Sequence, residues 1–403
     1  MRERYNNERF WKNAARVLLR KPAGYHWPPN PHLSTLPPFS IDFGSAMVGL
    51  DMRVTSLARE LVESRHDAGK KLLEWEIDRT GQLTAELIGA DPEEIYFSTS
   101  TTGAMEEALK NLKLRDGAEI LTTADEYGTI IGLLELKAQL HHGLVKSVTT
   151  NGDVVDSIRR AISPKTGLVV TSHVTHGTGK VLPIGEISDL TRERGVTYIV
   201  DAAQSVGHIP FDVRLYNPEM AVFCGHKWLR GQPTSGILYV AKKTGIKPAI
   251  FSSFYSQINR MRQPITTPGI NCFGESLYEN AEIGNDFALA HLGKVLEQHK
   301  KLGWEHEYRR IEHLGEIARQ VLGQNPYVIL SNPENPAPGI IPLRIKNIAE
   351  EDMANLLLYK FGIRVTLKPE SRLVRVSVSP FNTVDDIHVL DAAIKLIANY
   401  HYV

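Results

Sequence analysis

Lys227 is the residue whose type and position most strongly suggest chemistry, because it lies between two apolar runs, residues 220–224 and 236–240, with the composition of buried β-strands. Burying a lysine costs free energy unless its amine is neutral, paired or used covalently. Asp201 closes another apolar run at residues 196–200. Pyridoxal phosphate needs an amine for its aldehyde and a carboxylate for its ring nitrogen, so this pair of residues predicts a site for that cofactor.

The residues around this pair fit the same cofactor. Small side chains, Ala202 and Ala203, follow Asp201 and would let a planar ring approach the backbone, while Gln204 could hydrogen-bond the phenolic oxygen of the ring. Once a substrate amine displaces Lys227 from the cofactor, this lysine becomes the catalytic base for the Cα proton. Taken alone, Asp201 could equally be a helix N-cap, and Lys227 a solvated loop residue.

Other candidate residues follow the remaining predicted strands. Serine and threonine are concentrated at residues 98–103, where the amides and hydroxyls of a helix N-terminus could bind phosphate, although such residues are also common caps. Tyr127 could stack on an aromatic ring, or be an ordinary half-buried loop residue. His176 could contact substrate, although a lone histidine there is more often structural. Cys224 and His226 lie on the approach to the phosphate.

The scaffold for these residues is a segment from about residue 41 to 265 in which short apolar runs alternate with helical stretches. The predicted strands are residues 94–98, 119–122, 167–174, 196–200, 220–224 and 236–240, and the predicted helices are residues 105–112, 129–139, 154–161 and 187–194. Such alternation predicts an α/β fold with a mainly parallel sheet covered by helices on both faces. Because ligands bind beyond the carboxyl ends of such strands, the candidates support one another as a single pyridoxal phosphate site.

We expect three regions along the chain: an N-terminal arm at residues 1–40, a large cofactor-binding domain at 41–280, and a linking helix with a small C-terminal α+β domain at 281–403. In the last region, residues 340–345 and 373–378 have the pattern of strands. A helix is predicted to end at a glycine, residue 362, and another to begin at residue 383 with a capping-box signal.

The composition excludes several classes of partner. The 403 residues carry 46 basic and 46 acidic side chains, so no net charge favours nucleic acid or an anionic membrane. The two cysteines, Cys224 and Cys272, are too few for a disulfide framework and favour a reducing compartment. No apolar stretch reaches the length of a membrane span, and the N-terminus lacks the apolar core of a secretory signal. We expect a cytoplasmic protein without a metal ion.

Residues 200–207 and 225–231 resemble the cofactor-binding motifs of the class V aminotransferase family, in the branch of isopenicillin N epimerase-like proteins and cysteine desulfurases. The resemblance extends from about residue 41 to the C-terminus. It implies the fold of the fold-type I pyridoxal phosphate-dependent enzymes and a homodimer with its sites at the subunit interface. In such a dimer the segment 266–280, through Ser276, could contact the phosphate held by the partner subunit.

The resemblance also implies a role for each candidate residue. Lys227 would form the Schiff base with the cofactor, Asp201 would meet the pyridine nitrogen, and Gln204 would meet the phenolic oxygen. The side chains that would hold the phosphate are Thr101, Thr102 and His226. Arg375 resembles the arginine that clamps the substrate carboxylate, a role suited to a bidentate guanidinium. Without the family, Arg375 would be an ordinary charge at a strand edge.

The chain departs from the family pattern at four places. Tyr127 stands where desulfurases have a stacking histidine, and its surroundings resemble the epimerase-like branch. Cys224 replaces a serine that usually bonds the phosphate, and a thiol donates weakly. His176 occupies a position that is often Asn or Ser near the substrate, which makes it the candidate for substrate binding and specificity. Residues 365–372 lack the cysteine with which desulfurases accept sulfur, and this argues against a cysteine desulfurase.

The expected function is a pyridoxal phosphate-dependent reaction at the Cα of an amino acid. We favour a carbon–sulfur lyase that performs β-elimination on a cysteine S-conjugate or a related amino acid, because it needs no sulfur-accepting cysteine. An aminotransferase or an epimerase of an amino acid is the alternative, and decarboxylation is a further reaction open to the same chemistry. A non-enzymatic sensor is disfavoured because we find no helix-turn-helix module in the sequence.

Overall fold

The computed structural model describes residues 41–43, 67–246 and 283–402. The expected N-terminal arm and the segment 266–280 with Ser276 lie outside the described residues. Contacts divide the chain into two compact units. Of the described residues, the larger unit comprises 67–176, 181–246 and 283–304, and the smaller comprises 41–43, 177–180 and 305–402. The expected linking helix thus groups with the larger unit.

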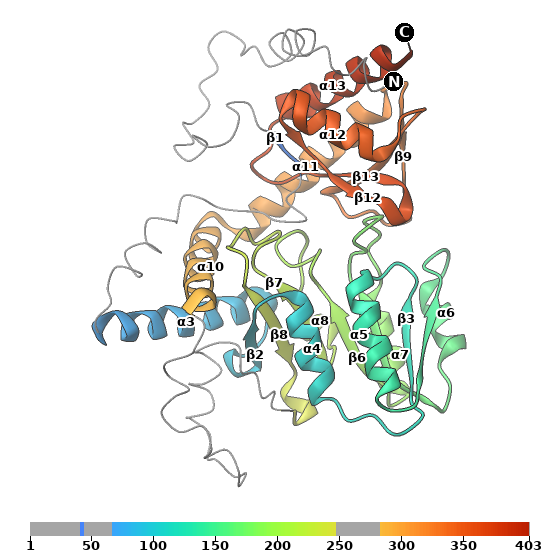
Figure 1. Ribbon diagram of the computed structural model, residues 1–403. Coiled ribbons are helices and arrows are strands. Elements are labelled where there is room, and N and C mark those ends of the chain that lie inside the picture. The colour runs from blue at the N-terminus through green and yellow to red at the C-terminus, as the bar shows by residue number, and fades with distance from the viewer. Residues whose placement is uncertain (1–40, 44–66, 247–282, 403) are drawn as a thin grey trace. The chain divides into compact units, whose positions relative to one another are not determined.

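The larger unit is built on a seven-stranded sheet with the order β2-β8-β7-β6-β5-β3-β4 (Figure 1). The strands are β2 (Ile95–Ser98), β3 (Glu119–Thr123), β4 (Leu144–Val148), β5 (Thr166–Ser172), β6 (Thr197–Asp201), β7 (Met220–Cys224) and β8 (Gly236–Val240). Neighbouring strands are parallel except at β8, which runs antiparallel to both β2 and β7. The predicted α/β fold class with a mainly parallel sheet is confirmed.

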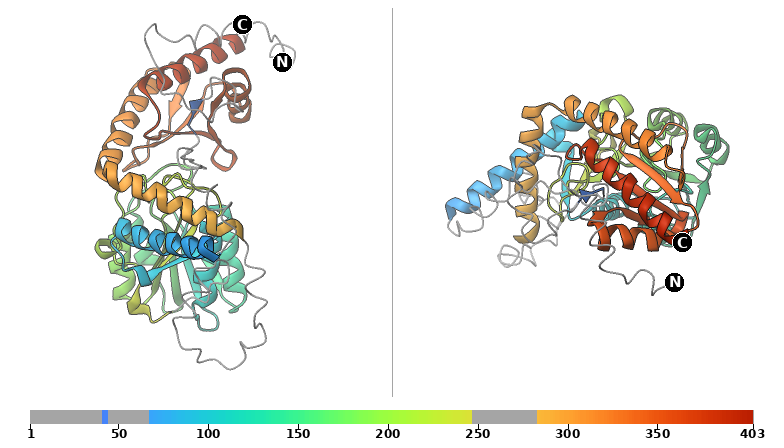
Figure 2. Two further views of the ribbon diagram at one scale, coloured as in Figure 1. Left: turned by 90° about the vertical axis from the view of Figure 1, so that its left-hand side faces the viewer. Right: turned by 90° about the horizontal axis from the view of Figure 1, so that it is seen from above.

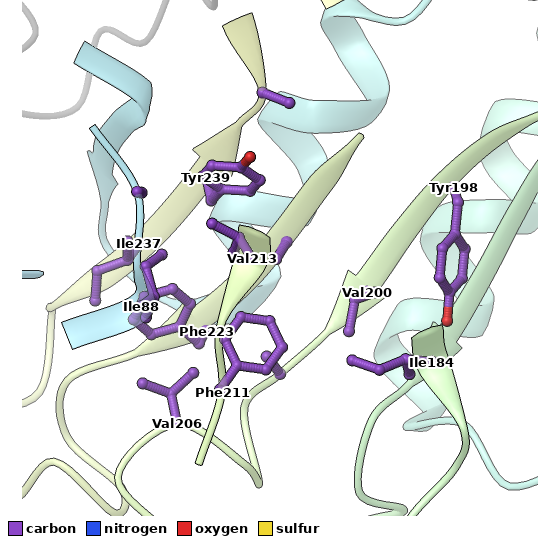
Figure 3. Close-up of a cluster of buried hydrophobic side chains, with 14 of the residues drawn as sticks. Ile88, Ile184, Tyr198, Val200, Val206, Phe211, Val213, Phe223, Ile237 and Tyr239 are labelled. Carbon is purple, nitrogen blue, oxygen red and sulfur yellow. The ribbon is translucent and has the colours of Figure 1, made fainter. Parts of the chain in front are cut away.

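Helices cover both faces of this sheet, with a separate hydrophobic cluster beneath each layer. The helices of this unit are α3 (Asp67–Ile88), α4 (Thr101–Asn111), α5 (Gly128–Gln139), α6 (Val154–Ala161), α7 (Ile184–Glu193), α8 (Val213–Tyr216) and α10 (Ile283–Leu302). Residues of α4 and α5 belong to one cluster, and residues of the other helices belong to the second, part of which is drawn in Figure 3. In β6, Tyr198 and Val200 enter one cluster and Ile199 the other, as the alternation of a strand requires. Burial on both faces therefore fixes where each strand ends.

Helix α10 packs along α3 within the larger unit (Figure 2). The buried hydroxyl of Thr80 in α3 donates to the carbonyl oxygen of Leu289 in α10 at 2.9 Å. Lys294 of α10 forms an ion pair with the buried carboxylate of Glu76 in α3, with Nζ and Oε1 2.5 Å apart. Among the described residues, no helix combines the length and the apolar character needed to cross a bilayer.

The smaller unit contains an antiparallel sheet with the order β12-β13-β10-β9 and a parallel pair, β1 and β11. Its elements are β1 (Ile41–Asp42), α11 (Trp304–Gly323, whose first residue belongs to the larger unit), β9 (Val328–Leu330), β10 (Ile340–Ile345), α12 (Glu350–Phe361), β11 (Ile363–Arg364), β12 (Thr366–Lys368), β13 (Leu373–Ser377) and α13 (Val384–Tyr402). Gly362 ends α12 with a left-handed backbone, as predicted. The predicted capping box at the start of α13 is also present, because Thr383 and Asp386 exchange side-chain to backbone hydrogen bonds.

Gly236, the first residue of β8, lies directly against the turn that begins α4. A Cβ atom on Gly236 would overlap the backbone nitrogen, carbon and oxygen of Ser100. Ser100 is the N-cap of α4, and its hydroxyl accepts a hydrogen bond from the amide of Gly103 at 3.0 Å. Because these are backbone atoms in a close-packed region, they cannot move aside as a flexible side chain could. A glycine is therefore needed at position 236 for the turn that begins α4 to pack against β8.

The Gly236→Ala variant is expected to lower the free energy of unfolding by about 2 kcal/mol, in the range for overpacked positions. Urea unfolding followed by circular dichroism measures this change. Gly132→Ala is the matched control, because a Cβ there meets nothing within 4 Å and alanine stabilises an exposed helix position by about 1 kcal/mol. Equal stability of Gly236→Ala and the wild type would show that the turn can withdraw from β8.

Candidate functional site

The carboxyl ends of the parallel strands bring the predicted site residues to one edge of the larger sheet. Ser172 at the end of β5 is paired in register with Asp201 at the end of β6. Five of the candidate residues follow the ends of β2, β3, β5, β6 and β7 in turn: Thr101, Tyr127, His176, Gln204 and Lys227. The sheet therefore arranges these groups along one edge.

The start of α4 and the turn after β7 present buried polar atoms that no group in the described part of the chain satisfies. Thr101 Oγ1 and His226 Nδ1 are both buried, and neither has a partner with good hydrogen-bond geometry among the described residues, although both residues lie close enough to the Cys224 thiol to lower its pKa. Leaving a buried donor unpaired costs about 1–3 kcal/mol, so such atoms are normally satisfied. Both can donate to an oxygen of a phosphate, and the helix N-terminus favours the same charge. This corner of the site fits the phosphate of pyridoxal phosphate.

Cys224 lies in the same corner and is buried. Burial raises the pKa of its thiol, but the ammonium of Lys227 and the polar groups of His226 and Thr101 lower that pKa by more. The net direction is downward. These influences show that four of the predicted residues, Thr101, Cys224, His226 and Lys227, are close together in the structure.

Asp201, the last residue of β6, supplies a buried carboxylate. One of its oxygens, Oδ1, accepts a hydrogen bond from the amide of Ala203 at 2.9 Å. Burial raises the pKa of Asp201, while the ammonium of Lys227 and the Ala203 amide oppose that rise. A protonated ring nitrogen would provide the further positive partner that a buried carboxylate needs. This end of the site fits the pyridine ring of the cofactor.

Glu126 is a buried carboxyl group at this edge that the sequence analysis did not single out. Its Oε1 accepts hydrogen bonds from Thr123 Oγ1 at 2.6 Å and from the Ser172 amide at 2.8 Å, and its Oε2 accepts one from Ser172 Oγ at 2.5 Å. Burial raises the pKa of Glu126 to about 7; the bonds from Ser172 and Thr123 lower it, and the charge of Asp201 raises it. Glu126 lies three residues beyond the end of β3, so no apolar run directly before it marks it as Asp201 is marked.

Gln204 is held by a tryptophan from the neighbouring turn. Trp228 Nε1 donates to Gln204 Oε1 at 2.9 Å. The ring of His208 stacks on the indole of Trp228, with centroids 3.8 Å apart and planes at 10°, and His208 Nδ1 donates to the backbone carbonyl of Gln204 at 2.9 Å. Neither Trp228 nor His208 was predicted from the sequence as a site residue.

Tyr127 and His176 are also brought together. Their rings meet edge to face, with centroids 5.4 Å apart and planes at 75°. Tyr127 is 46% exposed and forms the N-cap position of α5, so its ring is available at the surface of this edge. Thr102 is the second residue of α4 and is half-buried.

Arg375 lies in β13 of the smaller unit and is fully buried there. It pairs in register with Pro342 on β10 and with Thr366 on β12. Burial lowers the pKa of its guanidinium to about 10, which still leaves the group positively charged at neutral pH. Among the described residues, no cluster of three or more histidine, cysteine or acidic side chains has the grouping of a metal site.

A mainly parallel sheet with a smaller antiparallel unit, and a lysine and a buried aspartate at the carboxyl edge, is the arrangement of fold-type I pyridoxal phosphate enzymes. Residues 55–390 match the sequence model of the family described as aminotransferase class V. The chain therefore belongs to the class V aminotransferase family, and the resemblance seen in its motifs is confirmed. The protein is accordingly a pyridoxal phosphate-dependent enzyme.

Several known proteins are similar over most of the chain. Isopenicillin N epimerase of Streptomyces clavuligerus is 25% identical over 343 residues, which cover 77% of this chain and 81% of the relative. A probable cysteine desulfurase of Methanothermobacter thermautotrophicus is 25% identical over 351 residues, covering 79% and 82%. The structure of the cystine C–S lyase C-DES with its product cysteine persulfide has a TM-score of 0.78 at 22% identity, covering 91% of this chain and 99% of that chain. At that identity the likeness concerns the fold.

The raised pKa of Glu126 predicts a pH-dependent stability. The folded protein keeps a proton on Glu126 up to about pH 7, whereas the unfolded chain releases it near 4.5. The stabilising contribution of protonated Glu126 to the free energy of unfolding is therefore complete below pH 4.5. It is lost as the pH rises through 7, and it amounts to about 3 kcal/mol in all. The Glu126→Gln variant is expected to remove this fall.

Urea unfolding of the cofactor-free protein at pH steps from about 4 to 8 measures the difference between wild type and variant. Glu135→Gln, at an exposed position of α5, is the control and should leave the wild-type profile in place. Parallel profiles for Glu126→Gln and the wild type would contradict a protonated Glu126 in the folded state.

Proposed function

We propose that this enzyme is a carbon–sulfur lyase that eliminates the β-substituent of a cysteine S-conjugate or a related amino acid. The observation that carries the proposal is the hairpin before Arg375, in which β12 and β13 are joined through the short turn Pro369–Ser371 without a cysteine. A desulfurase needs a thiol there to accept sulfur, whereas a lyase that releases a whole thiol does not. The fold shared with a cystine C–S lyase is consistent with this choice.

In this proposal the cofactor is held at both ends. The side chains that would bind its phosphate are Thr101, Thr102, Cys224 and His226. The unpartnered buried atoms of Thr101 and His226 support this part of the proposal. Asp201 would keep the ring nitrogen protonated, Gln204 would donate to the phenolic oxygen, and Tyr127 would lie against the ring. The burial of Asp201 next to the charge of Lys227 supports its assignment.

The remaining residues would act on the substrate. Pyridoxal phosphate, when bound, supplies a ring that takes up the electron pair left at the substrate Cα. Lys227 would hold the cofactor through Nζ and, once the substrate amine replaces it, would remove the Cα proton. The Cβ–S bond then breaks, the sulfur leaves with the bonding electrons and takes up a proton, and hydrolysis of the remainder gives pyruvate and ammonia. Arg375 would bind the substrate carboxylate, and His176 would contact the substrate.

Epimerisation or transamination of an amino acid is the second candidate. It is favoured by Tyr127, which stands where desulfurases have histidine, and by the similarity to isopenicillin N epimerase over 77% of the chain. Both reactions begin with the same removal of the Cα proton by Lys227. They differ from elimination in where the proton returns, so product analysis separates them.

We also propose that the protein is a cytoplasmic homodimer. The family resemblance supports a dimer with shared sites, and the presence of only two cysteines supports a reducing compartment. Sedimentation equilibrium of the cofactor-loaded protein tests the dimer, and a monomer at micromolar concentration would contradict it.

The lyase proposal predicts pyruvate, ammonia and a free thiol from at least one member of a panel of cysteine S-conjugates. Lys227→Ala is expected to reduce the rate about 10²–10⁴-fold, because it removes the base. Borohydride treatment of the loaded wild type should add the cofactor mass to the peptide that contains Lys227. The control is Lys110→Ala, at an exposed position of α4.

Pyruvate from none of the conjugates would overturn the lyase proposal. Accumulation of the pyridoxamine form with an amino acid would instead indicate transamination, and deuterium at Cα with inverted configuration would indicate epimerisation.

Cys224→Ser is expected to bind pyridoxal phosphate about tenfold more tightly than the wild type, because a hydroxyl donates to a phosphate oxygen better than a thiol does. Titration of the cofactor by visible absorbance measures the Kd. Cys224→Ala is the control, since it removes the thiol without adding a donor. If the Cys224→Ser variant binds pyridoxal phosphate no more tightly than the Cys224→Ala variant, the side chain at this position does not reach the phosphate.

A further inference from the structure

We propose that Trp228 and His208 are positioning residues that fix the side-chain amide of Gln204, so that its nitrogen donates to the phenolic oxygen of pyridoxal phosphate. The inference rests on the role proposed above for Gln204 and adds to it the two residues through which that role is set. Neither Trp228 nor His208 need touch the cofactor.

The orientation of the Gln204 amide follows from the chemistry of the indole. Trp228 is 2% exposed, and its Nε1 lies 2.9 Å from Gln204 Oε1. An indole nitrogen can only donate, whereas an amide has one acceptor end and one donor end. The oxygen of the Gln204 amide must therefore be the end that faces Trp228. Its nitrogen is the donor end of the amide, the end that can donate to an acceptor such as a phenolate oxygen.

His208 holds the indole in place from the other side. The two rings are stacked at 3.8 Å with planes 10° apart, and both residues are buried. His208 Nδ1 also donates to the backbone carbonyl of Gln204, 2.9 Å away. The histidine thus fixes both the plane of the indole and the main chain from which the glutamine side chain extends.

Gly207 brings the two turns into backbone contact. Its φ is +85°, and a Cβ there would lie 2.9 Å from the carbonyl carbon of Trp228 and 3.0 Å from the nitrogen of Leu229. The turn after β6, which carries Asp201 and Gln204, is therefore packed directly on the turn after β7. Lys227 immediately precedes Trp228. The hydrogen bond from the Trp228 indole to Gln204 therefore links the turn after β7, which carries the reactive amine, to the turn after β6, which would hold the cofactor ring.

Loss of this contact should change the electronic state of the cofactor. A donor at the phenolic oxygen disperses negative charge that would otherwise hold a proton on the nitrogen of Lys227. When the donor is lost or turned away, the pH at which the visible absorbance of the bound cofactor changes should rise. A merely structural role for Trp228 would alter stability without moving this spectroscopic titration.

The test uses three variants of the full chain: Trp228→Phe, Gln204→Ala and the double variant. Trp228→Phe is expected to weaken cofactor binding about three- to tenfold, the worth of one hydrogen bond. It should also raise the midpoint of the absorbance titration by about half a pH unit. If Trp228 acts through Gln204, the tryptophan substitution should cause no further shift in the Gln204→Ala background.

Trp304→Phe is the matched control, because its ring also lies against a histidine, His299, at 5.0 Å between centroids. It should leave the titration midpoint unchanged. His208→Phe keeps an aromatic ring on the indole but removes the Nδ1 donor, and it should raise the midpoint by a smaller amount. This variant keeps the inference testable if Trp228→Phe does not fold, as judged by circular dichroism and Tm.

The outcomes distinguish this inference from the proposed function. A wild type that binds no pyridoxal phosphate at Lys227 would overturn the proposed function itself. A wild type that binds the cofactor, with an unchanged midpoint in folded Trp228→Phe, would overturn only the positioning role. Additive shifts of the two substitutions in the double variant would also overturn it, because they would show that Trp228 acts independently of Gln204.

Discussion

A carboxylate buried at the end of a central strand requires positive charge nearby, and Asp201 imposes that requirement on the residues around it. Its burial raises its pKa, and the ammonium of Lys227 is the main opposing influence. The same ammonium lowers the pKa of the Cys224 thiol, while the charge of Asp201 helps to raise the pKa of Glu126. The charges of this amine and this carboxylate therefore add to the effect of burial in shifting the pKa values of neighbouring groups along the edge. A cofactor with an aldehyde at one position and a basic nitrogen at another fits between them.

The scaffold makes this arrangement possible because its strands are buried on both faces. Alternate residues of β6 enter different hydrophobic clusters, so the strand cannot slip by one residue without moving large side chains to the wrong face. The end of each strand is thereby fixed, and so is the side chain that follows it. The close approach of Gly236 to Ser100 adds a further restriction on the turn at the start of α4.

The strands and the cofactor-binding residues could be predicted from the sequence more completely than the contacts between side chains. Strands such as β7 and β8 were predicted with their observed bounds, because a continuous apolar run is a strong signal for a buried strand. Strand β4 was missed because it is an edge strand with partly exposed residues and a lysine, Lys146, so no apolar run marks it. The Trp228–Gln204 hydrogen bond joins residues 24 positions apart in two turns, and only their packing in three dimensions reveals it. Glu126 has the sequence appearance of a solvated loop residue, since nothing local shows that Thr123 and Ser172 enclose it.

The antiparallel position of β8 has a consequence for the order in which the molecule is assembled. In the described sheet, β2 is hydrogen-bonded to β8 alone, so residues 95–98 have no strand partner until the ribosome has released residues 236–240. The turn that follows β2 packs against Gly236, so it also cannot form its native contacts until residues 236–240 have been synthesised. Closing so long a loop carries a one-time entropic cost that grows only slowly with its length. A nascent chain that ends between residues 227 and 236 therefore contains Asp201 and Lys227 but lacks the strand against which the turn at the start of α4 packs.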